Sequence, residues 1–152
     1  MIVNVDLVNL PQAAAVHSVS WQDSHRSFCS PDFIQLHSPE HQEEYLRQKI
    51  SQGSRVWILT ENEPIGIVSV TGSLIEDLYV LPDYQNRGYG AVLLQFAIRQ
   101  CEDTPVLWIL ENNTGAARFY RRAGFRETGR RNNITQGLDE IEFILENVCL
   151  KD

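Results

Sequence analysis

The sequence has 152 residues, of which 43% are hydrophobic and 22% are charged, and this is the size and composition of one globular domain with a substantial core. No apolar run reaches the ~20 residues of a membrane span, so we expect no membrane partner. A formal net charge of −7 argues against nucleic acid as a partner, because that binding depends on Lys and Arg side chains that neutralise phosphates. We therefore predict a single domain over residues 1–152.

Cysteine usage and the first residues indicate the compartment. Cys29, Cys101 and Cys149 are odd in number, widely spaced and free of any Cys-x-x-Cys pair, which favours reduced thiols. The segment from Met1 to Asp6 lacks the basic and apolar regions of a signal peptide. These features predict a cytoplasmic protein, and they leave both a monomer and a homodimer open.

The first third of the chain is predicted to hold one strand and two helices. The expected elements are a strand over 2–8, a helix opened by Pro11 with apolar spacing to Trp21, a connection over 26–37 and a helix from Pro39 to about Gly53. Ser38, Pro39 and Glu40 supply a capping hydroxyl, a proline for the first helical position and an acid in the first turn. This second helix carries few apolar residues, so we expect it at the surface beside a substrate cleft.

Two histidines near that helix start raise the question of a metal. His37 and His41 lie four residues apart, but Pro39 places His37 outside the helix and no further ligand cluster follows. We expect surface histidines and no metal.

The rest of the chain alternates between strands and helices. The expected elements are strands over 55–60, 65–70 and 74–81, a helix ending near Cys101, a strand over 106–110, a helix over 114–123 and strands over 125–130 and 141–145. The segment 61–64, Glu-Asn-Glu-Pro, separates two apolar runs and predicts a hairpin. The whole order is β-α-α-β-β-β-α-β-α-β-β.

A glycine-bearing turn follows the strand over 74–81. Pro82 ends that strand, and Gly88 and Gly90 precede apolar residues at helical spacing. The first N–H groups of a helix have no partner within it, and glycine allows a close approach of the backbone to a ligand. The turn therefore predicts a phosphate or pyrophosphate site, with an ordinary loop as the alternative.

The spacing of the turn separates the phosphate ligands. A P-loop requires a Gly-Lys pair, which the chain lacks, and the dinucleotide fingerprint requires a third glycine where Leu93 stands. The pattern that fits is Gln/Arg-x-x-Gly-x-Gly/Ala at Gln85, Gly88, Gly90 and Ala91. It resembles the acetyl-coenzyme A loop of the GCN5-related N-acetyltransferases, the GNAT superfamily.

Two further segments extend this resemblance. Asn113, Ala116, Phe119 and Tyr120, followed by Gly124-Phe125, are similar to the second signature of the family. The segment His17-Ser-Val-Ser-Trp21 is similar to the first helix of small bacterial members. The resemblance implies an α+β fold, an α/β/α sandwich with a mixed, mostly antiparallel sheet of about seven strands and about four helices.

The resemblance also implies a set of residues that bind the coenzyme. The strand backbone would pair with pantetheine, the turn would hold the pyrophosphate, and Asn113 would either contact pantetheine or cap its helix. The expected coenzyme-binding residues are Leu78, Tyr79, Val80, Gln85, Asn86, Arg87, Gly88, Tyr89, Gly90, Ala91, Asn113, Ala116 and Phe119.

Two carboxylates are candidates for the general base. In an extended strand Glu76 shares its face with Leu74, Leu78 and Val80, and burial of a carboxyl group on such a face raises its proton affinity. The alternative is an edge carboxylate that is exposed or paired with an arginine. Asp77 is the substitute, either as the base or as a subsite for positive charge on the substrate.

Tyr120 is the candidate acid. The resemblance implies that it lies near the coenzyme sulfur, where a phenol can protonate the leaving thiolate. The alternative is an aromatic core residue of the helix. Cys101 stands at a helix end with no motif around it, so we do not expect a covalent nucleophile.

Six arginines crowd into 14 residues near the second signature: Arg118, Arg121, Arg122, Arg126, Arg130 and Arg131. They form either a solvated face or, in one or two cases, a contact with the 3′-phosphate of the coenzyme.

The resulting functional hypothesis is an acetyl-coenzyme A-dependent N-acetyltransferase that acts on a primary amine of a small molecule or peptide. Two alternatives stay open. One is a coenzyme A-binding sensor module of the same fold without transferase activity, and the other is an unrelated nucleotide binder.

Overall fold

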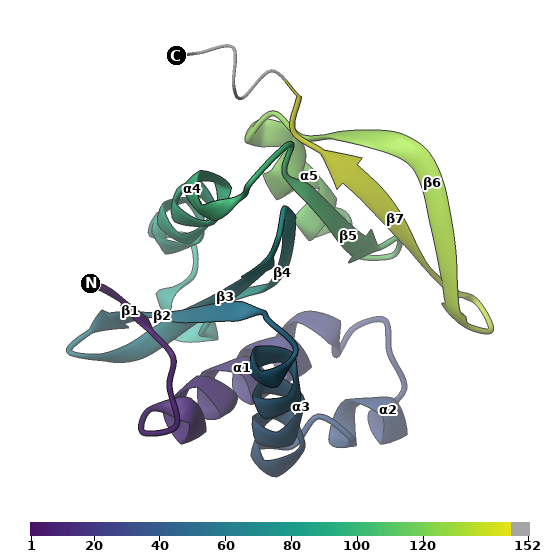
Figure 1. Cartoon of the computed structure of the whole chain (residues 1–152). Coiled ribbons are helices and arrows are strands. Elements are labelled where there is room, and N and C mark those ends of the chain that lie inside the picture. The colour runs from purple at the N-terminus through teal and green to yellow at the C-terminus, as the bar shows by residue number, and fades with distance from the viewer. Residues whose placement is uncertain (147–152) are drawn as a thin grey trace.

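A computed structural model describes residues 1–146 of the chain (Figure 1). The strands are β1 (Ile2–Asn4), β2 (Arg55–Glu61), β3 (Glu63–Thr71), β4 (Leu74–Val80), β5 (Val106–Leu110), β6 (Arg126–Thr135) and β7 (Leu138–Ile144). The helices are α1 (Leu10–His25), α2 (Pro31–Gln35), α3 (Pro39–Ser51), α4 (Tyr89–Gln100) and α5 (Thr114–Arg122), with a 3₁₀ turn η1 (Pro82–Tyr84). In these residues no helix combines the length and apolarity that a bilayer crossing requires.

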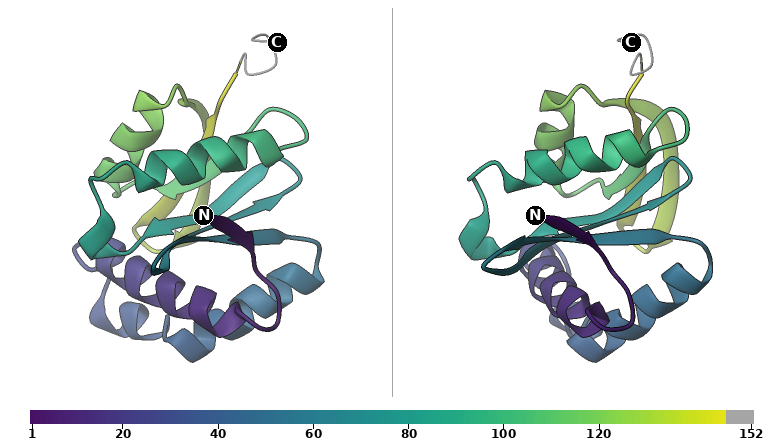
Figure 2. Two further views of the ribbon diagram at one scale, coloured as in Figure 1. Left: turned by 90° about the vertical axis from the view of Figure 1, so that its left-hand side faces the viewer. Right: turned by 60° about the vertical axis from the view of Figure 1, so that its left-hand side comes forward.

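All seven strands form one sheet in the order β1-β2-β3-β4-β5-β7-β6. The β4 and β5 pair is parallel and the other neighbours are antiparallel, so the predicted mixed, mostly antiparallel sheet is confirmed. Figure 2 shows α4 on one side of the sheet and α1 and α3 on the other, which is the expected three-layer arrangement.

The alternation along β3 places apolar side chains in both layers. Val68 and Val70 belong to a core that includes Leu93 and Leu94 of α4, whereas Ile67 belongs to a second core with residues of α1 and α3. Adjacent residues of a strand point to opposite faces, so a continuous apolar run fills two cores at once.

Four predicted boundaries are wrong, each for a local reason. The connection over 26–37 contains α2, because Pro31 occupies the first helical turn and the Ser30 hydroxyl accepts the Phe33 N–H at 3.3 Å. β1 ends at Asn4 rather than at residue 8, because the Asp6 carboxylate accepts the N–H groups of the following residues. β6 runs on to Thr135 rather than ending at residue 130, and β7 begins at Leu138 rather than at residue 141, because the two strands stay paired up to the turn between Thr135 and Leu138.

A β-bulge interrupts the pairing of β3 with β4. Glu76 pairs with Ser69 and Tyr79 pairs with Ile67, so Asp77 and Leu78 together stand opposite a single β3 residue. Asp77 has a φ of 57°, which is in the left-handed region. The bulge changes which side chains share a face of β4, and this alters the position of the candidate carboxylates.

Candidate active site

A groove opens where β4 and β5 separate. The two strands pair at Leu74 and Val106, near the start of each, and β5 then continues along β7. The end of β4, the glycine turn and α5 enclose a cavity of about 810 Å³. The predicted coenzyme-binding residues on its wall are Leu78, Tyr79, Val80, Gln85, Asn86, Gly88, Gly90, Ala91, Asn113, Ala116 and Phe119.

The glycine turn exposes backbone amides to this groove. Gly88 is the N-cap of α4 with a φ of 90°, and no side chain caps the helix there. The first N–H that bonds within this part of the helix is that of Val92, to the Gly88 carbonyl at 3.1 Å. Among residues 1–146 the amides before it have no hydrogen-bond partner and are therefore free for an anion, and the helix dipole adds partial positive charge.

The side chains of the turn brace it rather than fill the groove. Gln85 Nε2 donates to the Val80 carbonyl at 3.0 Å and ties the turn to the end of β4. The Arg87 guanidinium lies 5.4 Å from the ring centroid of Tyr84, and neither Arg87 nor Tyr89 is on the wall of the cavity. An uncapped helix N-terminus in a long groove fits a pyrophosphate with an extended arm.

Asn113 and Phe119 organise the opposite wall on α5. The Asn113 side chain accepts the Ala116 N–H at 3.1 Å, which is the capping role considered from the sequence. A methyl group added at Gly90 would lie 3.5 Å from the Phe119 ring, so α4 and α5 approach each other closely at the turn.

A second cavity of about 260 Å³ lies beside the groove. Aromatic and apolar side chains dominate its wall, together with the carboxylates Glu76, Asp77 and Glu140. The residues that line both cavities are Leu78, Tyr79, Asn113, Ala116 and Tyr120.

Tyr120 is thus part of the boundary between the two cavities. Its side chain is 8% exposed and packs edge-on against Phe119 and Phe125, with centroid distances of 5.0 and 5.8 Å. Burial raises the pKa of Tyr120, so the phenol stays protonated at neutral pH and can act as a donor.

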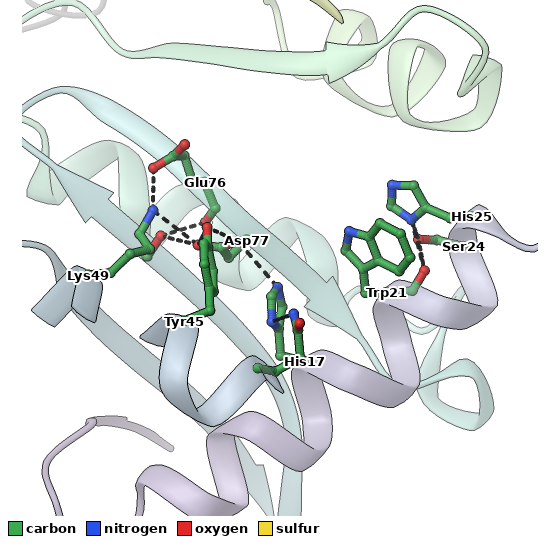
Figure 3. A network of polar contacts seen from close by, with 10 residues as sticks. His17, Trp21, Ser24, His25, Tyr45, Lys49, Glu76 and Asp77 are labelled. Atoms are coloured by element: carbon green, nitrogen blue, oxygen red, sulfur yellow. Dashed lines mark hydrogen bonds and ion pairs between the residues drawn. The ribbon is translucent and has the colours of Figure 1, made fainter. Parts of the chain in front are cut away.

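The expected placement of Glu76 on an apolar face is wrong. Because of the bulge, Leu78 and Val80 pack in the core beneath α4, whereas Glu76 points to the other side and pairs with Lys49 of α3 (Figure 3). Its side chain is 38% exposed. Glu76 is therefore the edge carboxylate of the alternative interpretation, with a lysine in place of the expected arginine.

Asp77 is the centre of a buried polar network (Figure 3). It accepts hydrogen bonds from the hydroxyls of Tyr45 and Ser69 at 3.1 and 2.8 Å. Lys49 Nζ lies 3.3 Å and His17 Nε2 lies 3.2 Å from its carboxylate oxygens. Burial alone would raise the pKa of Asp77, but the contacts with His17, Lys49 and Ser69 hold it well below its usual range.

The charges of this network also shift the pKa values of two partners of Asp77. Burial alone would lower the pKa of Lys49, but Asp77 and Glu76 outweigh it and raise the value. Burial and then the Asp77 charge raise the pKa of Tyr45. Lys49 is thus a cation and Asp77 an anion at neutral pH, so neither exchanges a proton readily.

Sequence reasoning missed these partners because three separate elements supply them. His17 comes from α1, Tyr45 and Lys49 from α3 and Ser69 from β3. The available signal was weak: Tyr45 and Lys49 are four residues apart and therefore share a helix face.

The six arginines divide between the two interpretations. Arg118 and Arg122 line the large groove. The other four pair with carboxylates: Arg121 with Glu127, Arg126 with Glu146, Arg130 with Glu142, and Arg131 with Glu111 and Asp139.

Known proteins share this sequence pattern and this architecture. A family model described as "Acetyltransferase (GNAT) domain" matches residues 52–127, half of the 152 residues. The chain is 32% identical over 75 residues to the peptidyl-lysine N-acetyltransferase YjaB of Salmonella typhimurium, which is 49% of this chain and 51% of that protein. The match thus spans about half the length of that curated relative.

Two solved structures share the fold over nearly the whole chain. The solution structure of apo-form YjaB from Escherichia coli has a TM-score of 0.68 at 21% identity, over 96% of this chain and 97% of that chain. The PaiA N-acetyltransferase of Thermoplasma acidophilum, solved in complex with coenzyme A, has a TM-score of 0.69 at 19% identity, over 94% and 96% of the two chains. At these identities the likeness establishes the fold.

Proposed function

The chain belongs to the GNAT acetyltransferase family, and from that premise we propose that it transfers the acetyl group of acetyl-coenzyme A directly to a primary amine. The observation that carries this proposal is the meeting of a long groove and a smaller cavity at Tyr120. Direct transfer requires both substrates to reach one point, and a shared wall provides it.

The large groove is the proposed donor site. The amides around Gly88 and Gly90 would hold the pyrophosphate, and the backbone of Leu78 to Val80 would pair with pantetheine where β5 has separated from β4. Arg118 and Arg122 would face the 3′-phosphate. Tyr120 would donate a proton to the thiolate as it leaves.

The smaller cavity is the proposed acceptor site. Its aromatic wall includes Trp21 and Phe33, and its carboxylates include Glu76 and Glu140. Such a wall suits an amine on an apolar stem that arrives as a cation, because carboxylates and aromatic faces both attract ammonium groups. A lysine side chain has this character, and the YjaB relative is named for peptidyl-lysine acetylation.

One observation favours a second function, a coenzyme A-binding module without transfer. Both candidate carboxylates are engaged, Glu76 by Lys49 and Asp77 by its four contacts, so neither is a free base. This alternative predicts coenzyme binding and no turnover.

The test is thiol release from acetyl-coenzyme A with a panel of lysine peptides, polyamines, amino acids and N-terminal peptides. We expect amine-dependent release of coenzyme A, with the acetylated product identified by mass spectrometry. Calorimetric binding of coenzyme A without release for any amine would favour the sensor module. No binding at all would rule out both.

Three further properties complete the proposal. Residues 1–152 would act as one functional unit, as a monomer or homodimer, without a resident metal. A cytoplasmic location suits thiols such as Cys29 and Cys101, which are free in the structure.

A further inference from the structure

His25 lies on the wall of the smaller cavity and, unlike Glu76 and Asp77, is not engaged by a lysine within the described part of the chain. It is the last residue of α1, its side chain is only 4% exposed, and it lines the smaller cavity together with Tyr120. The ring of Trp21 stacks on it at a centroid distance of 3.9 Å, and Tyr79 of β4 lies at 6.2 Å. The imidazole is therefore held at the cavity wall by packing.

The hydrogen bonds of the ring determine which nitrogen carries the proton. His25 Nδ1 lies 2.8 Å from the Trp21 carbonyl oxygen and 2.8 Å from the Ser24 hydroxyl (Figure 3). A carbonyl oxygen only accepts, so the hydrogen of the neutral ring is on Nδ1 and the lone pair is on Nε2.

The second ring nitrogen is available to a ligand. Within residues 1–146 no group forms a hydrogen bond to His25 Nε2, and Figure 3 shows this side of the ring turned away from the α1 backbone. Burial lowers the pKa of His25 to about 4. The hydrogen bond to the Trp21 carbonyl partly offsets this shift, and the nearby His37 and His17 add to it. The ring is therefore a neutral acceptor at physiological pH.

We propose that His25 is the general base of the acetyl transfer, an inference that rests on the proposed function. The bound ammonium group first loses one proton to solvent. The neutral amine nitrogen then attacks the thioester carbon, the new C–N bond forms and the carbonyl oxygen takes the negative charge. A proton of that nitrogen moves to His25 Nε2. The C–S bond then breaks, the sulfur takes the proton of the Tyr120 hydroxyl, and the proton on His25 returns to the phenolate through solvent.

This assignment explains how a base can act while both carboxylates are engaged. An amine loses its basicity as the C–N bond forms, so even a weakly basic imidazole can accept the proton at that stage. The titratable groups around His25 are His17 on its own helix, His37 after α2, Tyr79 of β4, Tyr120 of α5 and the cavity carboxylates Glu76, Asp77 and Glu140.

Three variants test the proposal. His25→Asn retains a donor that can reach the Trp21 carbonyl but removes Nε2, and His25→Ala leaves room for added imidazole. His37→Asn is the matched control, because His37 also contacts a carbonyl four residues before it through Nδ1, at 3.1 Å, and stacks on Trp21 at 3.4 Å. His37 is not on the wall of the cavity.

We expect kcat for the best amine to fall about 100-fold in both His25 variants, with the Kd for coenzyme A unchanged. Imidazole should restore part of the His25→Ala rate, in proportion to its neutral form, and His37→Asn should retain most of the activity. A His25→Asn enzyme with wild-type kcat, or a His25→Ala enzyme that imidazole does not restore, would overturn the proposal.

A second measurement separates this proposal from the proposed function. In the coenzyme A complex of the wild-type protein, ¹⁵N NMR should show His25 as the Nδ1–H tautomer, and n-butylamine should shift its Nε2 signal. If turnover is absent for every amine, the proposed function fails. An Nε2 signal that n-butylamine leaves unchanged then overturns the role of His25 as well. A shifted signal without turnover would overturn the role of general base and leave only a contact between His25 and the amine.

Discussion

The two cavities that meet at Tyr120 are built in different ways. The large groove presents backbone: the amides at Gly88 and Gly90 and the strand segment from Leu78 to Val80. The smaller cavity presents side chains that α1, β4 and β5 bring together. A backbone site can therefore be recognised from a short local motif, whereas a side-chain site depends on the tertiary fold.

We expect the largest effect on stability from the loss of a buried charge beside the smaller cavity. Asp77→Ala removes the carboxylate that faces Lys49, whose side chain is 11% exposed, and leaves that cation without its buried partner. We expect a loss of roughly 3–5 kcal/mol in the free energy of unfolding, measured by urea denaturation.

Glu76→Gln is the matched control for this change. Glu76 pairs with the same lysine but is 38% exposed, so its loss should cost about 1 kcal/mol or less. Equal losses for the two variants would mean that the network around Asp77 does not support the cavity wall.

A substitution at Tyr120, which lines both cavities, tests the role of its hydroxyl. Tyr120→Phe keeps the packing against Phe119 and Phe125 and removes only the hydroxyl. If the hydroxyl protonates the leaving thiolate, kcat should fall about 100-fold while the Kd for coenzyme A stays the same.

Steady-state thiol release and calorimetry make this measurement, with Tyr84→Phe as the control. Tyr84 donates to Glu63 at 2.7 Å and lines neither cavity, so its variant should retain the wild-type kcat. An unchanged kcat for Tyr120→Phe would assign Tyr120 to the core alone.

Acid should destabilise the protein through His25, which lines the smaller cavity. The folded pKa of His25 lies at about 4, below its unfolded value of about 6.5, so the unfolded state binds more protons between these values. Stability is therefore full above pH 6.5 and falls as the pH drops toward 4. For His25 alone the loss between pH 7 and pH 5 should be about 2 kcal/mol.

Urea denaturation at pH 7 and pH 5 measures this loss, and His25→Asn should reduce it. His37, whose pKa burial also lowers, contributes a slope in the same direction that the variant retains. Identical pH dependence in the wild type and the variant would show that His25 is not buried as a neutral ring.

The same contrast explains what the sequence could predict. The strand, glycine turn and α4 follow one another in the chain, so the order of elements could be predicted from a local motif. The same motif predicted the groove residues Gln85, Asn86, Gly88, Gly90 and Ala91, but Arg87 and Tyr89, which it also included, lie off the wall of the groove. The position of Glu76 could not, because strand alternation gives its face only if the pairing is regular, and the bulge at Asp77 breaks it.

His25 was missed for a related reason. Its sequence neighbours do not indicate a site, and its role depends on Tyr79 and Tyr120, which are 54 and 95 residues further along the chain. The capping role of Asn113 was open to prediction, since an N-cap and the amide it accepts are three residues apart. Contacts across the sheet have no comparable local signal.

The smallest effect is expected from a backbone change in the large groove. Gly88→Val places a β-branched side chain at a φ of 90°, where L-residues are strained by roughly 1–2 kcal/mol. If the turn relaxes to relieve this strain, its amides leave the anion site, and the Kd for coenzyme A should rise about 10-fold. Gly53→Val is the matched control, because Gly53 has a φ of 106° with no heavy atom within 4 Å of an added methyl group, and it lies outside both cavities. The control should lose similar stability and bind coenzyme A normally, so equal affinities in the two variants would contradict a donor site made of backbone.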